Sequence, residues 1–154
     1  ILQKIPAPEF NVSVKINLST NTDGDRAGLI LYGLNYAWVG IQRHQGHYEL
    51  RYTTCTGAGK CQEKVLEQKA ISSSELHFKL SMRAGGIAQF YYSENTNPNA
   101  KNFTAIGAPF VATQGRWVGV KIGLFSVTPT ATPSTVNRQN TYADFSSFNI
   151  KAAD

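Results

Sequence analysis

Apolar and polar residues alternate along most of the segments that could form regular structure. The clearest case is residues 10–18, where apolar side chains occupy every second position. Successive side chains of a β-strand point to opposite faces, so this pattern predicts a strand with one buried and one solvated face. The same reasoning predicts about ten strands, at residues 10–18, 27–33, 36–43, 47–54, 63–68, 76–82, 87–93, 103–111, 117–125 and 142–150.

Turn residues separate these segments, and no segment keeps the 3.6-residue period of a helix. Gly85-Gly86 predicts a tight hairpin turn, and the stretches 95–102 and 128–139 are rich in Asn, Thr, Ser and Pro, which is typical of exposed loops. Many short antiparallel strands with regular turns predict an all-β sandwich or barrel. We expect residues 1–154 to form a single domain.

Charge and hydrophobicity exclude two classes of partner. The net charge is +5, but Lys and Arg are spread singly along the chain, whereas a nucleic-acid-binding protein clusters them. A solvated basic surface explains the charge, so we expect no nucleic-acid partner. No apolar run approaches the length of a transmembrane helix, so we expect no membrane insertion.

The two cysteines, Cys55 and Cys61, flank a Gly-rich stretch. This stretch predicts a turn, across which the two thiols could face each other, so we expect a disulfide. Such a bond would contribute about 2 kcal/mol by restricting the unfolded chain. It would also place the protein in an oxidising compartment, so we expect a secreted or periplasmic location.

Seven segments together resemble one known family, the C-terminal concanavalin A-like domain of glycoside hydrolase family 43 enzymes, which are β-xylosidases and α-arabinofuranosidases. The more specific part is a Gly-x-Trp-x-Gly-x-Lys-x-Gly-Leu-Phe run at 115–125, followed by Tyr-Ala-Asp-Phe at 142–145. The sequence departs from the usual pattern at Ser146 and Ser147, where an acidic residue and a Trp are common. The matching segments are residues 5–10, 23–30, 33–38, 89–93, 103–107, 115–125 and 142–145.

The resemblance implies a two-sheet antiparallel jelly-roll sandwich of the concanavalin A-like lectin/glucanase type. It also implies that the domain is excised from the C-terminal end of a longer glycoside hydrolase that degrades xylan or arabinan. In such enzymes the catalytic carboxylates lie on a preceding propeller domain, so the resemblance assigns no catalytic residue here. The expected partner is the catalytic domain of the same chain, and the expected role is to dock on it or to complete its pocket.

An enzyme that acts by itself would need a cluster of carboxylates. Glu63 and Glu67 are a close acid pair, but they adjoin Lys64 and Lys69 and do not form the tight cluster that retaining glycosidases of this fold use. The alternative to an accessory role is an independent carbohydrate-binding module, for which a xylo- or arabino-oligosaccharide is the expected ligand.

Strand alternation identifies a candidate carbohydrate-binding or interdomain face. In residues 36–43 the small apolar side chains at 37, 39 and 41 fit an interior, which turns the other side chains outward. Aromatic rings can pack on sugar rings, while amide and guanidinium groups bond hydroxyls. The same aromatic residues could instead pack on the catalytic domain or be ordinary sheet-surface side chains. The expected face comprises Tyr36, Trp38, Gln42, Arg51, Gln89, Tyr91 and Lys121, with Gly119 and Gly123 leaving a low floor beside Lys121.

A structural calcium ion is the one cofactor for which the sequence offers ligands, and no other cofactor is expected. Asp144 lies in the last predicted strand, and calcium requires six or more oxygen ligands, of which one Asp supplies at most two. Glu9, together with Asp23 or Asp25, could supply more. The alternative is that these acids occupy turns or surface salt bridges.

Overall fold

In the computed structural model, the burial of every second side chain along the strands organises the fold. The structure describes residues 1–57, 60–115, 119–129 and 140–153. Strand β2, Phe10–Ser19, shows it most plainly, because buried and partly buried residues alternate along its whole length. Its inward side chains are all apolar, and each is 2% exposed or less. The strand therefore has one face in the core and one face at the surface.

The strands form two antiparallel sheets. Sheet A has six strands in the order β1-β10-β3-β4-β5-β6, and sheet B has five in the order β11-β2-β7-β8-β9. The remaining elements are β1 (Leu2–Lys4), β3 (Arg26–Tyr32), β4 (Tyr36–His44), β5 (His47–Cys55), β6 (Lys64–Ile71), β7 (Glu75–Arg83), β8 (Ile87–Ser93), β9 (Thr104–Val111), β10 (Lys121–Val127), β11 (Tyr142–Ala152) and the 3-10 helix η1 (Ala100–Asn102).

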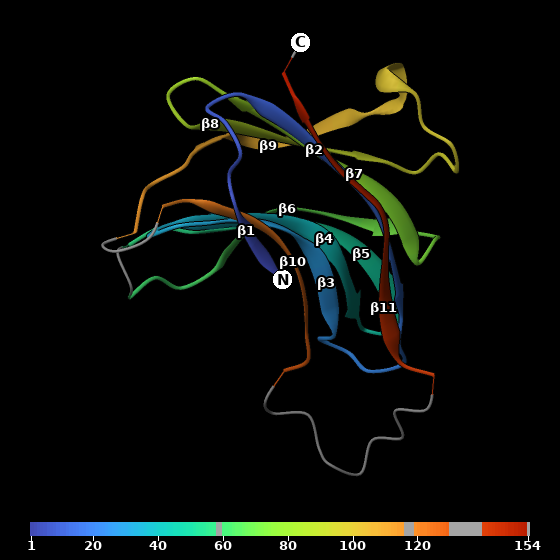
Figure 1. The fold of residues 1–154 in the computed structure, drawn as a ribbon. Helices are drawn as coiled ribbons and strands as arrows, with labels where there is room; N and C mark the ends of the chain where they lie inside the picture. The colour runs from blue at the N-terminus through green and yellow to red at the C-terminus, as the bar shows by residue number, and fades with distance from the viewer. Residues whose placement is uncertain (58–59, 116–118, 130–139, 154) are drawn as a thin grey trace.

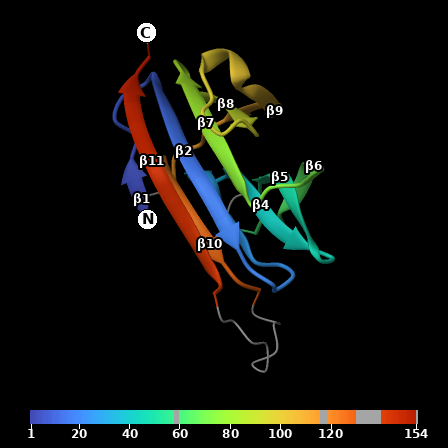
Figure 2. The ribbon, with the colours of Figure 1, turned by 90° about the vertical axis from the view of Figure 1, so that its right-hand side faces the viewer.

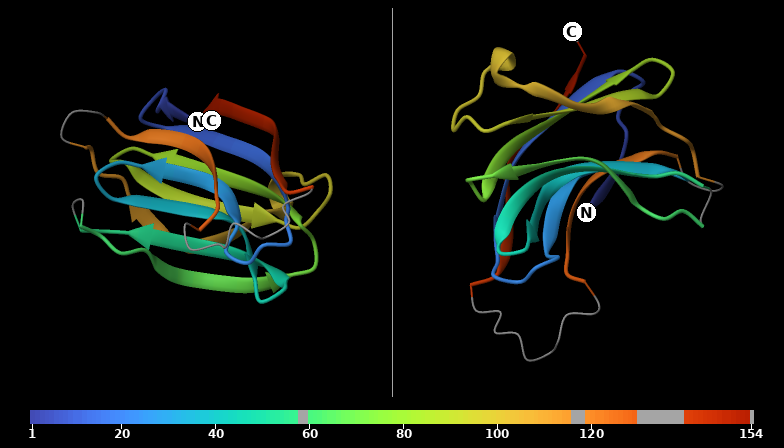
Figure 3. Two further views of the ribbon diagram at one scale, coloured as in Figure 1. Left: turned by 90° about the horizontal axis from the view of Figure 1, so that it is seen from below. Right: turned by 180° about the vertical axis from the view of Figure 1, so that it is seen from behind.

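The two sheets stack face to face, as Figure 1 shows. One apolar core lies between them. Figure 2 shows β11, β2 and β7 side by side in sheet B. In the right-hand view of Figure 3, sheet A bends so that the side turned away from sheet B is hollow. We call this hollow side the concave face. Its side chains project away from the core, because the opposite side of sheet A packs against sheet B.

Polar contacts around Tyr52 close the edge of the sandwich where β6 approaches β9. The Tyr52 ring is 1% exposed, and its hydroxyl donates to the carbonyl of Ala108 at 3.3 Å. The amide of the adjacent Gly107 donates to the Glu67 carboxylate at 2.9 Å. Burial, followed by the nearby charge of Glu67, raises the pKa of Tyr52 to about 12. These contacts join β5 and β6 of sheet A to β9 of sheet B.

The expected two-sheet antiparallel jelly-roll sandwich is confirmed, and nine of the expected strands agree with observed ones within a few residues. The tenth, expected at 117–125, begins at Lys121; residues 116–118 and 130–139 lie outside the described residues. Two elements were not predicted from the sequence: β1, a short strand paired with β10, and η1 in the Asn-rich loop. Within the described ranges, no helix has the length and apolarity to cross a membrane.

Substitution of Gly107 tests the closure of this edge. Gly107 has a φ of +70°, and an added Cβ would overlap the Tyr52 ring. We expect Gly107→Ala to lower the free energy of unfolding by about 3 kcal/mol, because backbone strain and overpacking add. Gly85→Ala is the matched control, since Gly85 has a φ of +82° with no neighbour within 4 Å. Urea unfolding of both variants measures the difference, and an equal loss would contradict the packing.

Candidate functional site

The concave face carries five of the seven residues expected to form a binding or docking surface. Tyr36, Trp38 and Gln42 lie on β4, Arg51 lies on β5 and Lys121 lies on β10. Their neighbours along each strand, including Val39, Leu50 and Ile122, are in the core, so these five side chains project to the other side.

The expectation that Gln89 and Tyr91 share this face is wrong. Both lie on β8, which belongs to sheet B, and so they face away from the concave face. The Gln89 amide donates to the carbonyls of Ile106 and Gly107, while Lys79 lies 5.6 Å from the centre of the Tyr91 ring. Strand alternation indicates the side of a sheet on which a residue lies, but not the sheet to which its strand belongs.

Trp38 is on the expected face but is not accessible there. The side chain is 1% exposed, because Phe125 packs edge-on against the indole with ring centres 5.2 Å apart. The Arg26 guanidinium covers the ring at 5.2 Å from its centre. Phe125 also lies over Gly28, where no side chain competes for the space. A sugar ring therefore cannot stack on Trp38 in this conformation.

Glu63 joins the side chains that cover Trp38. Its carboxylate accepts hydrogen bonds from Arg26 Nη1 at 2.8 Å, from the Tyr36 hydroxyl at 3.0 Å and from Trp38 Nε1 at 3.1 Å. Burial, followed by the charge and hydrogen bond of Glu63, raises the pKa of Tyr36 to about 12. We call these side chains, together with Phe125, the Glu63 cluster.

The disulfide between Cys55 and Cys61 precedes Glu63 in the chain. The two Cα atoms are 5.4 Å apart, and the bond closes the connection between β5 and β6. Gly57, inside this connection, donates its amide to the Asn35 side chain at 3.0 Å. By fixing both ends of the connection, the disulfide restricts where Glu63 can lie relative to the concave face.

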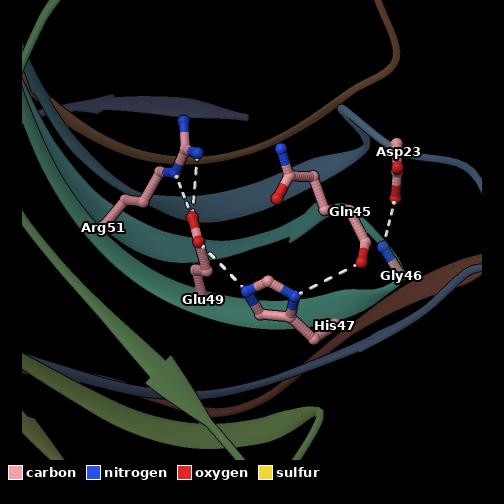
Figure 4. Close-up of polar contacts among 6 residues, drawn as sticks. All are labelled: Asp23, Gln45, Gly46, His47, Glu49 and Arg51. Atoms are coloured by element: carbon pink, nitrogen blue, oxygen red, sulfur yellow. Dashed lines mark hydrogen bonds and ion pairs between the residues drawn. The ribbon is translucent and has the colours of Figure 1, made fainter.

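A second polar network lies along β5, as Figure 4 shows. The Glu49 carboxylate accepts bonds from Arg51 Nε at 3.0 Å and Nη2 at 2.8 Å, and lies 3.2 Å from His47 Nε2. Burial opposes ionisation of Glu49, but the hydrogen bonds and charge of Arg51, together with His47, outweigh it and hold the pKa of the Glu49 carboxyl below its usual value. Asp23 accepts the amide of Gly46 at 3.1 Å and so supports the β4–β5 turn.

Tyr32 is an accessible aromatic residue of the concave face that was not predicted from the sequence. Its ring is 43% exposed and stacks on Tyr36, with ring centres 5.9 Å apart and planes inclined by 24°. In the register of sheet A, Tyr32 lies directly between Lys121 and Tyr36. The short Gly-Leu-Asn spacing between the two tyrosines was a sequence signal for this pair, because a tight turn places them opposite each other.

Gly123 does not contribute to the low floor expected beside Lys121. Gly123 is covered by β1, and the backbone of Ile1 and side chain of Leu2 occupy the space that a Cβ would need. Gly119 lies outside the strand and has no neighbour within 4 Å of an added Cβ. The expectation failed at Gly123 because it took no account of β1.

An apolar groove of about 920 Å³ runs along the edge of the sandwich formed by β1, β10 and β11 and reaches Tyr32 and Phe125 on the concave face. We call it the edge groove. It contains several exposed apolar side chains, notably Ile1 at 98%, Leu2 at 46% and Phe148 at 40% exposure. Its lining residues are Ile1, Leu2, Gln3, Ile30, Tyr32, Ile122, Gly123, Leu124, Phe125, Ser126, Phe145 and Phe148.

Glu9 and Asp144, two of the expected calcium ligands, are not brought together. Glu9 directly precedes β2, whereas Asp144 pairs with Asn17 near the other end of that strand. Eight residues of extended chain separate the two positions by about 27 Å. The Glu9 carboxylate instead accepts the amide of Ala84 at 3.2 Å. Among the residues that the structure describes, no group of three or more His, Cys, Asp or Glu side chains could hold a metal ion.

The ionic state of Glu49 predicts how stability changes in acid. A carboxyl whose pKa is lowered by folding contributes stability at pH values above its unfolded pKa, and that contribution disappears as the pH falls through the folded pKa. We expect Glu49→Gln to cost about 2 kcal/mol at pH 7 and progressively less below about pH 4. The matched control is Glu94→Gln, because Glu94 pairs with Lys69 at the surface. Urea unfolding from pH 3 to pH 7 measures both; a pH-independent loss for Glu49→Gln would contradict the assignment.

Comparison with solved structures identifies similar folds in longer proteins. A bifunctional GH43-CE protein from Bacteroides eggerthii has a TM-score of 0.77 and 24% identity over 96% of this chain, which spans 18% of that protein. Xylan β-1,4-xylosidase from Bacillus halodurans has a TM-score of 0.75 and 15% identity over 97% of this chain, which spans 29% of that enzyme. A functionally unknown protein from Saccharomyces cerevisiae has a TM-score of 0.67 and 15% identity over 99% of this chain, which spans 72% of it.

These identities establish a shared fold and no more. No curated protein sequence is significantly similar to this chain. A family model is more specific: the model described as the β-xylosidase C-terminal concanavalin A-like domain, of glycoside hydrolase family 43, matches residues 1–151. The chain therefore belongs to the family of β-xylosidase C-terminal concanavalin A-like domains.

Proposed function

We propose that this chain is a non-catalytic accessory domain that serves a family 43 catalytic domain on the same polypeptide. Membership in a family of C-terminal domains supports the proposal, as does the small share of the B. eggerthii and B. halodurans proteins that the chain spans. The B. halodurans protein is described as a xylan β-1,4-xylosidase, and another similar structure is an engineered GH43 glycoside hydrolase with endo-xylanase and exo-arabinofuranosidase activity. We therefore propose xylan or arabinan as the substrate of the catalytic domain.

The observation that carries the proposal is that the carboxylates of Glu49 and Glu63 are both held by hydrogen bonds and ion pairs. Hydrolysis of a glycosidic bond requires two carboxyl groups that flank the bond, one of which donates a proton. In the described part of the concave face, Glu49 is occupied by Arg51 and His47, and Glu63 is occupied by Arg26, Tyr36 and Trp38. The lowered pKa of Glu49 also opposes the role of a proton donor at neutral pH.

We further propose that the protein works in an oxidising compartment, either outside the cell or in a periplasm. The disulfide between Cys55 and Cys61 supports this proposal. Disulfides persist in such compartments and are reduced in most cytosols.

Carbohydrate binding by the domain itself is the second candidate function. The stacked pair of Tyr32 and Tyr36, beside Lys121, favours it, because aromatic faces pack against sugar rings. Trp38 is not a suitable probe of this function, since removal of so deeply buried a ring would cost about 3–5 kcal/mol of stability. Tyr32 is suitable because its ring is 43% exposed.

Activity of the 154-residue chain tests its non-catalytic character. We expect no release of sugar from xylo- or arabino-oligosaccharides, because neither Glu49 nor Glu63 on the concave face is free to act as an acid or base. Product analysis by chromatography, with a family 43 xylosidase as positive control, measures this. Hydrolysis that disappears in Glu63→Gln, while the variant keeps the wild-type circular dichroism spectrum, would refute the proposal.

Calorimetric titration of the same oligosaccharides separates the two candidate functions. For an accessory domain we expect a dissociation constant weaker than about 1 mM, which corresponds to less than about 4 kcal/mol of binding free energy. Binding at 1 mM or tighter that is lost in Tyr32→Ala, but kept in Tyr91→Ala on sheet B, would instead favour the carbohydrate-binding module.

A further inference from the structure

The edge groove differs from the opposite edge of the sandwich in the residues that it exposes. At the opposite edge, β6 exposes Val65 and Leu66, but the same strand carries Lys64, Glu67 and Lys69. Charged side chains on an edge strand discourage association with other proteins. The strands of the other edge also carry charges, at Lys4, Asp144 and Lys151, but among the described residues that line the edge groove itself none has a charged side chain.

A β-bulge in β11 contributes to this apolar surface. The pairing of β11 with β2 shifts between Ser146 and Asn149, and Ser147 has a φ of +53°. Strict alternation from Phe145 would turn Phe148 to the outer side of sheet B. The extra residue of the bulge reverses this, so that Phe148 lines the same groove as Phe145. The bulge thus brings an aromatic side chain to the groove and leaves it 40% exposed.

The first strand, β1, lies beside the same groove. Ile1 and Leu124 are hydrogen-bonded in both directions, at 2.9 Å each, so β1 lies along β10 with Ile1 in the groove. The family model describes a C-terminal domain and matches from residue 1, so β1 is the first strand of the matched domain. A catalytic domain joined to this strand would be held close to the groove, which raises its effective concentration there.

From the groove, the bulge and the position of β1, we infer that the edge groove is the surface on which the catalytic domain of the same polypeptide docks. This inference rests on the proposed function, since it names the surface that an accessory domain would use. Tyr32 and Phe148 are the expected anchors, because partly exposed aromatic side chains contribute much of the binding energy of protein interfaces. Because no charged side chain lines the described groove, we expect the docking of the catalytic domain to depend little on salt concentration.

Hydrogen exchange tests this inference on the full-length polypeptide and on the 154-residue chain. We expect the backbone amides of β1 and of the Phe148 bulge to exchange at least about tenfold more slowly in the full-length protein than in the 154-residue chain, because docking excludes water from them. The difference should persist between 0.1 M and 0.5 M NaCl. The double variant Tyr32→Ser/Phe148→Ser should remove the extra protection.

The matched control is Leu66→Ser/Val111→Ser. These residues are 55% and 58% exposed and lie on β6 and β9, at the opposite edges of the two sheets, so the control should keep the protection. Because all four side chains are at least 40% exposed, both double variants should fold, which circular dichroism verifies.

Each other outcome contradicts the inference in a distinguishable way. Extra protection at β6 and β9, or on the concave face beside Arg51, would show that the catalytic domain docks on another surface than the edge groove. The proposed accessory function would then still hold. No extra protection anywhere on the domain would overturn both. Concentration-dependent protection of the groove in the 154-residue chain alone would assign it to a second copy of the chain.

Discussion

The side chains that sheets A and B bury against each other leave each strand with a single free side. In β4 this burial takes Ala37, Val39 and Ile41 into the core, and it obliges Tyr36, Trp38 and Gln42 to project onto the concave face. The same constraint acts on β5, where Leu50 and Tyr52 are in the core and Glu49 and Arg51 are on the other side. The content of the concave face is thus a consequence of how the core is packed.

The concave face is itself partly closed by side-chain contacts. Trp38 lies at its centre, and Phe125, Arg26 and Glu63 cover the ring and satisfy its N–H group. A buried indole requires a hydrogen-bond acceptor, so Glu63 has a structural role in this cluster. The same cluster occupies the Glu63 carboxylate with hydrogen bonds from Arg26, Tyr36 and Trp38. The sequence suggested that Trp38 could stack on a sugar ring. In the structure its side chain is instead buried by its neighbours, as core residues are.

Regular alternation explains why most of the fold could be predicted and why part of the site could not. The pattern of apolar residues determines the strands and their buried sides, as in β2, but it does not determine which strands share a sheet. Gln89 and Tyr91 were therefore assigned to the wrong face. Alternation also does not show which side chains of neighbouring strands lie over a residue, so the burial of Trp38 by Phe125 and Arg26 was not predicted.

Local departures from alternation account for the remaining differences. The bulge at Ser147 reverses the side on which Phe148 lies. The apolar positions of β11 change there from 143 and 145 to 148 and 150, a signal that the expectation of one regular strand did not use. Strand β1 is only three residues long, which is too short for a periodic signal, yet it covers Gly123 and defines one wall of the edge groove. The site features that escaped prediction are thus those that depend on a single residue or a single tertiary contact.

Exchange of the Trp38 indole N–H with solvent deuterium, followed by NMR, tests most directly whether the concave face is closed. We expect this proton to exchange more slowly than that of a free indole by about a hundredfold or more, because the N–H donates to Glu63 beneath Arg26 and Phe125. Exchange at the rate of a free indole would show that the ring is open to water. The concave face would then be available to a sugar, and Glu63 could not have the structural role that we assign to it.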